Sequence, residues 1–294
     1  MIEQAFRFQN GNYELYGFLH HAEATDVDGS APRGVVLCGP FAEEKQFSQR
    51  ILVNLARTLA SNGIHALRFD YMGYGDSDGN FEDCRLETYL NDIRAAVDVL
   101  RKKTNVTEIG LFGLRFGTTL AILAQEKYNL ADFLVLWAPV LDCPKYIYDS
   151  LKANLAHQMV FYREVKYNRT QLVEQLMQGG SVNIEGHEVP GAFYRQISDI
   201  HLLKNQSIPK IATLMVLITK FENAPAPPEL IEYQQLISAK IESASLKIVV
   251  EDLFWTESKR YTPYSENLFS ETMTWLEQLR TNEIAKVDYA GGRI

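Results

Sequence analysis

A glycine-flanked pentapeptide near the middle of the chain has the spacing of a catalytic turn. Residues Gly113 to Gly117 read Gly-Leu-Arg-Phe-Gly. In the motif Gly-x-Ser-x-Gly, a serine stands on a sharp strand-to-helix turn, and the glycines are needed because side chains would collide there. Arg115 occupies the serine position. A guanidinium stays protonated and offers no nucleophilic atom, so this turn cannot start acyl transfer in the usual way.

The two other members of a serine triad are equally hard to place. Such a triad follows the chain order serine, acid, histidine, and the histidine belongs after the last strand. All six histidines precede residue 202, and the late region holds Asp252, Phe254 and Trp255 instead. Glu222 is an acid in the expected position, but it has no imidazole to orient. Because triad chemistry needs a nucleophile beside a base, we expect no conventional serine esterase or peptidase activity.

Four other side chains are weaker candidates for chemistry. Cys38 ends the apolar run Gly34 to Gly39, which favours a buried thiol over a reactive one. His157 and His187 fall in an insert that lies over the turn, where a solvated or capping histidine is the simpler interpretation. Ser77 lies in a glycine-rich loop and is expected to make a local turn hydrogen bond.

Arg115 itself has two interpretations. At a helix N-terminus, exposed N–H groups and the helix dipole already favour an anion, and a guanidinium adds a bidentate receptor for carboxylate or phosphate. Alternatively, an acidic side chain of the protein satisfies it, because a cation without a partner is costly to bury. The two are compatible if the acids leave Arg115 partly free. The candidate partners are Glu43, Glu44, Glu222, Glu251 and Asp252.

Strands and helices alternate around this turn. The N-terminus reads as a hairpin about Asn10-Gly11-Asn12. Apolar runs of strand length then alternate with helical patterns such as Leu86 to Lys103 and Phe116 to Lys127. This alternation implies a mostly parallel sheet covered by helices on both faces. The pattern stops after Pro139 and resumes with "KIATLMVLITK".

The order of elements matches the α/β-hydrolase fold, with an insert in the usual lid position. We expect one core made of residues 1–140 and 206–294, and a cap made of residues 141–205. The cap sequence is helical and aromatic, and it includes Tyr146, Tyr148, Phe161 and Tyr162. These aromatic side chains either pack within the cap or offer stacking faces to a sugar or an acyl chain.

Short motifs carry a family resemblance. "RFDYMGYGDSDG" resembles the loop after the fourth strand of serine-aminopeptidase-like and esterase-like α/β hydrolases. "GPFAEEKQFSQR", "GLRFGTTLA", "VNIEGHEVPGAFYRQI" and "EDLFWTES" together resemble the exosortase-A-associated hydrolases of the second type. That resemblance implies a bacterial protein linked to exopolysaccharide and protein sorting. Gly39 stands where that group has proline, and fold alone does not establish chemistry.

The fold places a ligand pocket at the carboxyl ends of the strands, around Arg115. Arg115, Glu222 and Asp252 are the candidates for any unconventional catalysis, and Gly113 and Gly117 are structural. The residues expected to line the pocket are Gly39, Pro40, Phe41, Glu43, Glu44, Leu114, Arg115, Phe116, Phe254 and Trp255.

Composition limits the function classes. The 294 residues carry a formal net charge of −8 and no long basic run, which argues against nucleic-acid binding. No apolar run is long enough to span a membrane and no leader is evident, so we expect a cytoplasmic protein. Three scattered cysteines fit neither a disulfide framework nor a metal clamp, and we expect no metal or cofactor.

The leading hypothesis is a pseudo-enzyme with a degenerate triad that binds a small molecule, such as an anionic sugar or an acyl compound, as an accessory factor in surface-polysaccharide export or sorting. The alternative is an active hydrolase or acyltransferase for an ester, amide or thioester, with an unconventional site. A third interpretation is a scaffold that binds a protein partner through its cap.

Overall fold

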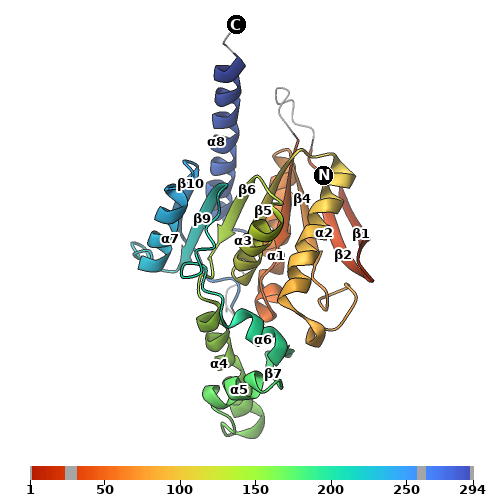
Figure 1. Ribbon diagram of the computed structural model, residues 1–294, viewed down its shortest axis with the longest axis vertical. Helices are drawn as coiled ribbons and strands as arrows, with labels where there is room; N and C mark the ends of the chain where they lie inside the picture. Colours follow the sequence, from red (N-terminus) through yellow and green to blue (C-terminus); the bar gives the residue numbers. More distant parts are fainter. Residues whose placement is uncertain (1, 24–31, 257–262, 292–294) are drawn as a thin grey trace.

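The computed structural model describes residues 2–23, 32–256 and 263–291, and the side chains at positions 153, 157 and 282–291 lie outside this description. An eight-stranded sheet forms the centre of the molecule, in the order β1-β2-β4-β3-β5-β6-β9-β10 (Figure 1). β2 runs antiparallel to both of its neighbours, and the pairs from β4 to β10 are parallel. The strands are β1 (Glu3–Asn10), β2 (Tyr13–His20), β3 (Arg33–Cys38), β4 (Ile64–Asp70), β5 (Glu108–Leu114), β6 (Phe133–Trp137), β9 (Ala212–Thr219) and β10 (Ala244–Val250).

Helices cover both faces of this sheet, as the strand–helix alternation predicts. Every residue of β3 and β6 is buried, which explains why β6 and the part of β3 after Arg33 are continuous apolar runs. Two cores result, one on each face: α1 and α8 belong to the first, and α2, α3 and α7 to the second. These helices are α1 (Glu43–Ser61), α2 (Leu86–Thr104), α3 (Phe116–Tyr128), α7 (Pro228–Ser238) and α8 (Glu266–Gly291). This is the α/β-hydrolase fold.

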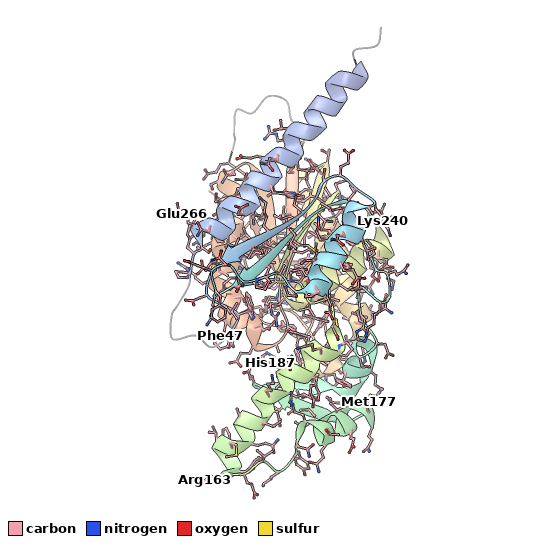
Figure 2. The ribbon with its side chains drawn as sticks, turned by 90° about the vertical axis from the view of Figure 1, so that its left-hand side faces the viewer. Phe47, Arg163, Met177, His187, Lys240 and Glu266 are labelled. Carbon is pink, nitrogen blue, oxygen red and sulfur yellow. The ribbon has the colours of Figure 1, made fainter. Side chains whose placement is uncertain are left out.

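The chain between β6 and β9 leaves the sheet and forms a separate lobe below it, which we call the cap (Figure 1). Its first helix begins at Asp142, whose carboxylate accepts a hydrogen bond from the Lys145 N–H at 2.9 Å, with Pro144 in the first turn. The helix then runs away from the sheet to Arg163, at the far end of the lobe (Figure 2). The cap elements are α4 (Cys143–Tyr162), α5 (Arg169–Met177), β7 (Ser181–Ile184), β8 (His187–Pro190) and α6 (Gly191–Ile197).

Stacked aromatic rings join the cap to the core beside the turn at Arg115. Phe193 of α6 lies parallel to Phe41, with ring centroids 5.3 Å apart. Tyr146 of α4 lies parallel to Phe116, with centroids 5.8 Å apart. Because all four rings are buried, these contacts fix where α4 and α6 begin relative to the core.

Candidate functional site

The backbone at Arg115 has the strained geometry of a nucleophile turn. Arg115 lies between β5 and α3 with φ 54° and ψ −124°, a conformation that a non-glycine residue adopts only when its surroundings hold it there. Its N–H donates to the Trp137 carbonyl at 3.0 Å. Its carbonyl accepts from the N–H and the hydroxyl of Thr118, at 2.9 and 2.6 Å. The turn therefore projects an arginine side chain where a serine would otherwise stand.

The two flanking glycines are required by close backbone approach. A Cβ on Gly113 would lie 2.5 Å from the Cα of Thr118, and a Cβ on Gly117 would lie 2.2 Å from the carbonyl oxygen of Cys38. Neither neighbour is a flexible side-chain end, so neither can move aside cheaply. The glycines therefore serve the turn itself, whatever chemistry takes place at Arg115.

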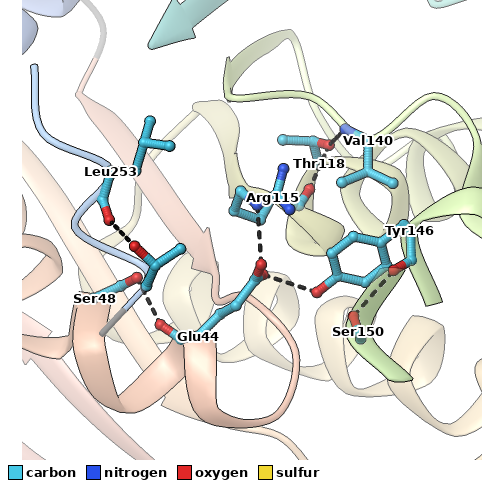
Figure 3. Close-up of polar contacts among 9 residues, drawn as sticks. Glu44, Ser48, Arg115, Thr118, Val140, Tyr146, Ser150 and Leu253 are labelled. Atoms are coloured by element: carbon cyan, nitrogen blue, oxygen red, sulfur yellow. Dashed lines mark hydrogen bonds and ion pairs between the residues drawn. The ribbon is translucent and has the colours of Figure 1, made fainter. Parts of the chain in front are cut away.

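The Arg115 guanidinium is held on three sides. Its Nε donates to Glu44 Oε1 at 3.1 Å (Figure 3). Its Cζ lies 5.2 Å from the ring centroid of Tyr146 and 5.2 Å from that of Trp255, so it packs between two aromatic rings. The Arg115 side chain is still 24% exposed. Among the described residues, nothing accepts a hydrogen bond from its two terminal amino groups.

Several acids were candidate partners for Arg115 in the sequence, and Glu44 is the one that contacts it. Its second carboxylate oxygen accepts from the Tyr146 hydroxyl at 2.8 Å, so both oxygens are occupied (Figure 3). Burial raises the pKa of Glu44 above its usual value, although the Arg115 charge and the hydrogen bonds from Tyr146 and Arg115 oppose that shift. The Glu44 side chain is 20% exposed, so water still reaches the pair.

A cavity of about 660 Å³ lies beside this pair, between the core and the cap. The turn contributes Arg115, the start of α1 contributes Glu43 and Glu44, and α4 contributes Tyr146. Six acidic and two basic side chains line it, and several belong to segments that the sequence did not single out. The charged lining residues are Glu43, Glu44, Asp142, Asp149, Glu185, Glu229, Arg115 and Lys145.

Five of the residues expected around the pocket line this cavity: Phe41, Glu43, Glu44, Arg115 and Trp255. The other five lie elsewhere. Leu114, Phe116 and Phe254 are buried in the two cores, and Pro40 is buried in the loop after β3. Gly39 borders a smaller cavity of about 230 Å³ on the far side of that loop, next to Lys45 and Asp70. A position at the end of a strand therefore predicts that a residue lies near the site, but it does not predict whether the side chain points into the cavity.

The two acids proposed to support an unconventional catalysis do not line the cavity. Glu222 lies in the loop after β9 and is exposed, and it is not among the residues that line the cavity. Asp252 lies two residues after the end of β10, is also absent from the lining, and its N–H bonds the side chain of Glu251. The structure therefore offers neither carboxylate to a group bound at Arg115.

No nucleophile–base pair faces the cavity among the described residues. Burial raises the pKa of the Cys38 thiol to about 12, which leaves no thiolate at neutral pH. His187 packs against Phe81 at 5.0 Å between ring centroids, away from Arg115. Ser77 donates to the Asp70 carbonyl at 2.6 Å, which is the turn bond expected of it. The side chain of His157 lies outside the described residues.

Two residues of the loop after β3 supply no N–H to an anion hole for acyl transfer. In this fold such a hole combines the N–H after the catalytic residue with one from that loop. Pro40 has no N–H to offer, and the Ala42 N–H donates to the Tyr74 hydroxyl at 2.8 Å.

Among the described residues, no helix holds a stretch long and apolar enough to cross a membrane. The His, Cys, Asp and Glu side chains of these residues include no group of three placed to bind a metal ion.

Sequence comparison finds two partial relatives. The chain is 34% identical to human Protein ABHD12B over 121 residues, which cover 40% of this chain and 32% of the human protein. It is 29% identical to the uncharacterized protein RP471 of Rickettsia prowazekii over 133 residues, which cover 45% of this chain and 54% of the relative. The chain thus matches about a third and about half of the lengths of these relatives.

Solved structures extend the likeness over nearly the whole chain. Est1E from Butyrivibrio proteoclasticus, solved with ferulic acid bound, has a TM-score of 0.61 at 19% identity and covers 96% of this chain and 100% of its own. The α/β hydrolase GrgF from Penicillium sp. sh18 has a TM-score of 0.62 at 17% identity and covers 95% and 99%. At such identities the likeness establishes the fold alone.

Residues 29–182, more than half of the chain, match the family described as "Serine aminopeptidase, S33". The protein therefore belongs to the serine aminopeptidase S33 family of the α/β-hydrolase superfamily.

Proposed function

We propose that the protein binds a small anionic molecule in the cap-covered cavity, with Arg115 as the receptor for its carboxylate or phosphate group, and that it does not perform serine-hydrolase chemistry. One observation carries the proposal. Glu44 occupies the Nε edge of the guanidinium and two rings occupy its faces, which leaves the edge with both terminal amino groups for a ligand. That edge can pair with a carboxylate or a phosphate through two parallel hydrogen bonds.

The rest of the lining favours a ligand that also carries hydroxyl groups. Glu43 and Glu229 line the cavity and accept hydrogen bonds from hydroxyls. Asp149 is less available, because Lys145, Lys152 and Arg169 contact it at 2.6 to 3.8 Å. A cavity of about 660 Å³ is of the size that holds small organic ligands. An acidic sugar combines the anionic group, the hydroxyls and the size.

The biological setting of this proposal comes from the sequence resemblance to exosortase-A-associated hydrolases. It makes the protein a bacterial, cytoplasmic accessory factor for surface polysaccharide or protein sorting, in which an anionic sugar or an acyl compound is a reasonable ligand. In such a role no nucleophile is needed at the turn, because Arg115 presents a cation to the bound molecule instead.

Matched ligand pairs test the proposal by calorimetry. Galacturonate and galactose 1-phosphate should bind more tightly than galactose, and Arg115→Met should weaken the anions about tenfold or more, the value of one charge-assisted contact. Lys145→Met is the control, because Lys145 lines the same cavity but is exposed and paired with Asp149. Equal affinity for galactose and its anionic analogues, or equal affinity in Arg115→Met, would refute the proposal.

A second candidate is an active hydrolase or acyltransferase with an unconventional site. The observation in its favour is the mixture of carboxylates and a cation around one cavity, which can polarise a substrate and a water molecule. Turnover of short- and medium-chain p-nitrophenyl esters tests it, with Arg115→Ala and an active esterase as controls. Turnover that disappears in Arg115→Ala, with folding intact, would favour this candidate. Turnover no greater than the buffer background would reject it for these esters.

A further inference from the structure

The far end of the cap exposes an unusual set of apolar side chains, which we call the cap tip and define as residues 159–167. Val160 is 76% exposed and Phe161 is 68% exposed, at the end of α4. The segment between α4 and α5 also exposes large apolar side chains, at Val165 and Tyr167. The large apolar side chains exposed in the cap tip are Met159, Val160, Phe161, Tyr162, Val165 and Tyr167. Contiguous exposed apolar surface of this kind marks an interaction site more often than chance exposure.

The cap tip carries a small positive charge on an otherwise acidic protein. Residues 159–167 hold the cations Arg163 and Lys166 against one acid, Glu164, whereas the whole chain has a formal net charge of −8. The cations Lys152 and Arg169 flank the cap tip, and both contact Asp149, at 3.3 and 3.8 Å. Figure 2 places Arg163 at the end of the molecule farthest from the sheet.

Two of these cations lie on aromatic rings at the cap surface. Lys166 Nζ lies 3.8 Å from the ring centroid of Tyr162, and Arg169 Cζ lies 4.3 Å from that of Tyr148. Cations and aromatic rings are therefore interleaved over one protruding surface.

We propose that the cap tip docks on an anionic lipid surface. Aliphatic side chains there would enter the boundary between headgroups and acyl chains, tyrosine rings would lie at headgroup level, and lysine and arginine would pair with lipid phosphates. Charge complementarity favours this partner over a second copy of the chain, because a symmetric pairing of two cap tips would bring like charges together.

The geometry of α4 links docking to the cavity. The helix begins beside the cavity, which Tyr146 lines, and ends in the cap tip at Tyr162. Sixteen residues of α-helix span about 24 Å, so the cavity would stand about that far from the lipid headgroups. Docking thus fixes the distance of the site from the membrane, and it does not depend on which ligand the cavity binds.

Vesicle co-sedimentation tests this proposal with the whole protein. The wild type should sediment with vesicles of equal parts phosphatidylglycerol and phosphatidylcholine, much less with phosphatidylcholine alone, and less as salt is raised. Val160→Asp with Phe161→Asp should reduce binding about tenfold or more, as should Arg163→Glu with Lys166→Glu. The matched control is Ile2→Asp with Phe221→Asp, which changes two equally exposed apolar residues on the core.

The outcomes separate cleanly, because all substituted side chains are exposed and thermal melts can verify folding. Loss of binding in both cap-tip variants, with the control unchanged, supports the proposal. Wild-type protein that stays in solution with anionic vesicles overturns it. So does binding that is equal in the Val160→Asp, Phe161→Asp variant and the control. A concentration-dependent dimer that the same variant abolishes, without vesicle binding by the wild type, would assign the cap tip to self-association instead.

Discussion

Glu44 holds Arg115 by one edge of its guanidinium: Oε1 accepts from Nε at 3.1 Å while Oε2 accepts from the Tyr146 hydroxyl at 2.8 Å. Each carboxylate oxygen thereby has one donor, while the terminal amino groups of Arg115 have no acceptor among the described residues. A bidentate ion pair through both terminal amino groups would have closed them to a ligand. The contact with Glu44 stabilises the partly buried positive charge of Arg115. Because it uses Nε alone, the terminal amino groups stay available to the cavity.

Glu44→Gln should separate two effects of Glu44 on Arg115: the hydrogen bond that positions the guanidinium, and the negative charge that neutralises it. The amide oxygen can still accept from Nε and the amide nitrogen can donate to the Tyr146 hydroxyl, so we expect unfolding free energy to fall by only about 1 kcal/mol. Anion affinity should rise about fivefold, because one negative charge within contact distance has been removed. Calorimetry and urea unfolding measure both effects. Glu43→Gln is the control, and weaker anion binding in Glu44→Gln would contradict the arrangement.

The raised pKa of Glu44 adds a pH dependence to the same site. As pH falls through that pKa, Glu44 gains a proton and no longer neutralises Arg115, so the affinity for an anion should rise. A sugar sulfate is the suitable probe because its own charge stays constant over the range. Titrations at successively lower pH, starting from neutral, should show the rise in the wild type and none in Glu44→Gln. The same rise in both proteins would trace it to another group.

Arg115→Ser should not create an esterase. The substitution restores the residue type of a nucleophile turn, but no histidine lines the described cavity to accept the hydroxyl proton. We therefore expect no burst of p-nitrophenol and no labelling by a fluorophosphonate probe, with an active serine esterase as the positive control. Labelling of Arg115→Ser above the level of Arg115→Ala would reveal a base that the geometry does not supply.

Gly117→Ala should prevent stable folding or cost about 3 kcal/mol or more, because its Cβ would lie 2.2 Å from the Cys38 carbonyl oxygen. Gly39→Ala is the matched control in the adjacent loop, where no atom lies within 4 Å of the added carbon. Expression level and thermal melting compare the two variants. A Gly117→Ala protein as stable as Gly39→Ala would mean that the turn is looser than described.

The sequence predicts this turn well because its constraints are local. Two glycines at a fixed spacing, after an apolar strand and before a helix, leave few conformations for the residue between them. The alternation of apolar runs and helical patterns likewise predicts a mostly parallel sheet with helices on both faces.

The partners of Arg115 could not be predicted in the same way. Five acids in three loops were equally plausible, and the choice of Glu44 depends on how α4 packs, since Tyr146 from that helix completes the arrangement. The aromatic pattern of α4 could have indicated Tyr146, but helical spacing alone does not separate a site residue from cap packing. Glu222 follows its strand as the fold requires, but the sequence carries no signal for whether its side chain lines the cavity, and in the structure it does not.

A buried carboxyl far from the cavity gives a test of the structure by pH. Asp92 of α2 is fully buried and accepts from Asn10, from the Tyr13 hydroxyl and from the Met72 N–H, at 2.7 to 2.9 Å. Burial nevertheless raises its pKa from 3.8 to about 6. Between these values the folded protein keeps a proton that the unfolded chain has released, so this contribution to stability falls as pH rises, by about 3 kcal/mol in total.

His20 should oppose that trend. It is fully buried, its Nε2 accepts from Arg68 at 3.0 Å, and burial lowers its pKa to about 4. Here the unfolded chain binds the extra proton, so stability rises with pH over a similar window. Asp92→Asn should therefore steepen the rise of stability between pH 4.5 and 6 relative to the wild type, and His20→Gln should do the reverse. Urea unfolding at several pH values measures this, and parallel curves for all three proteins would contradict it.

The availability of the terminal amino groups of Arg115 is the central claim, and nitrogen NMR of arginine-labelled protein tests it most directly. The Arg115 signals are assigned by their loss in Arg115→Lys. Addition of galacturonate should shift the two terminal nitrogens and slow their exchange, while Nε, already bonded to Glu44, should move much less. A titration in which galacturonate binds but the terminal nitrogens do not respond would show that the anion is held elsewhere.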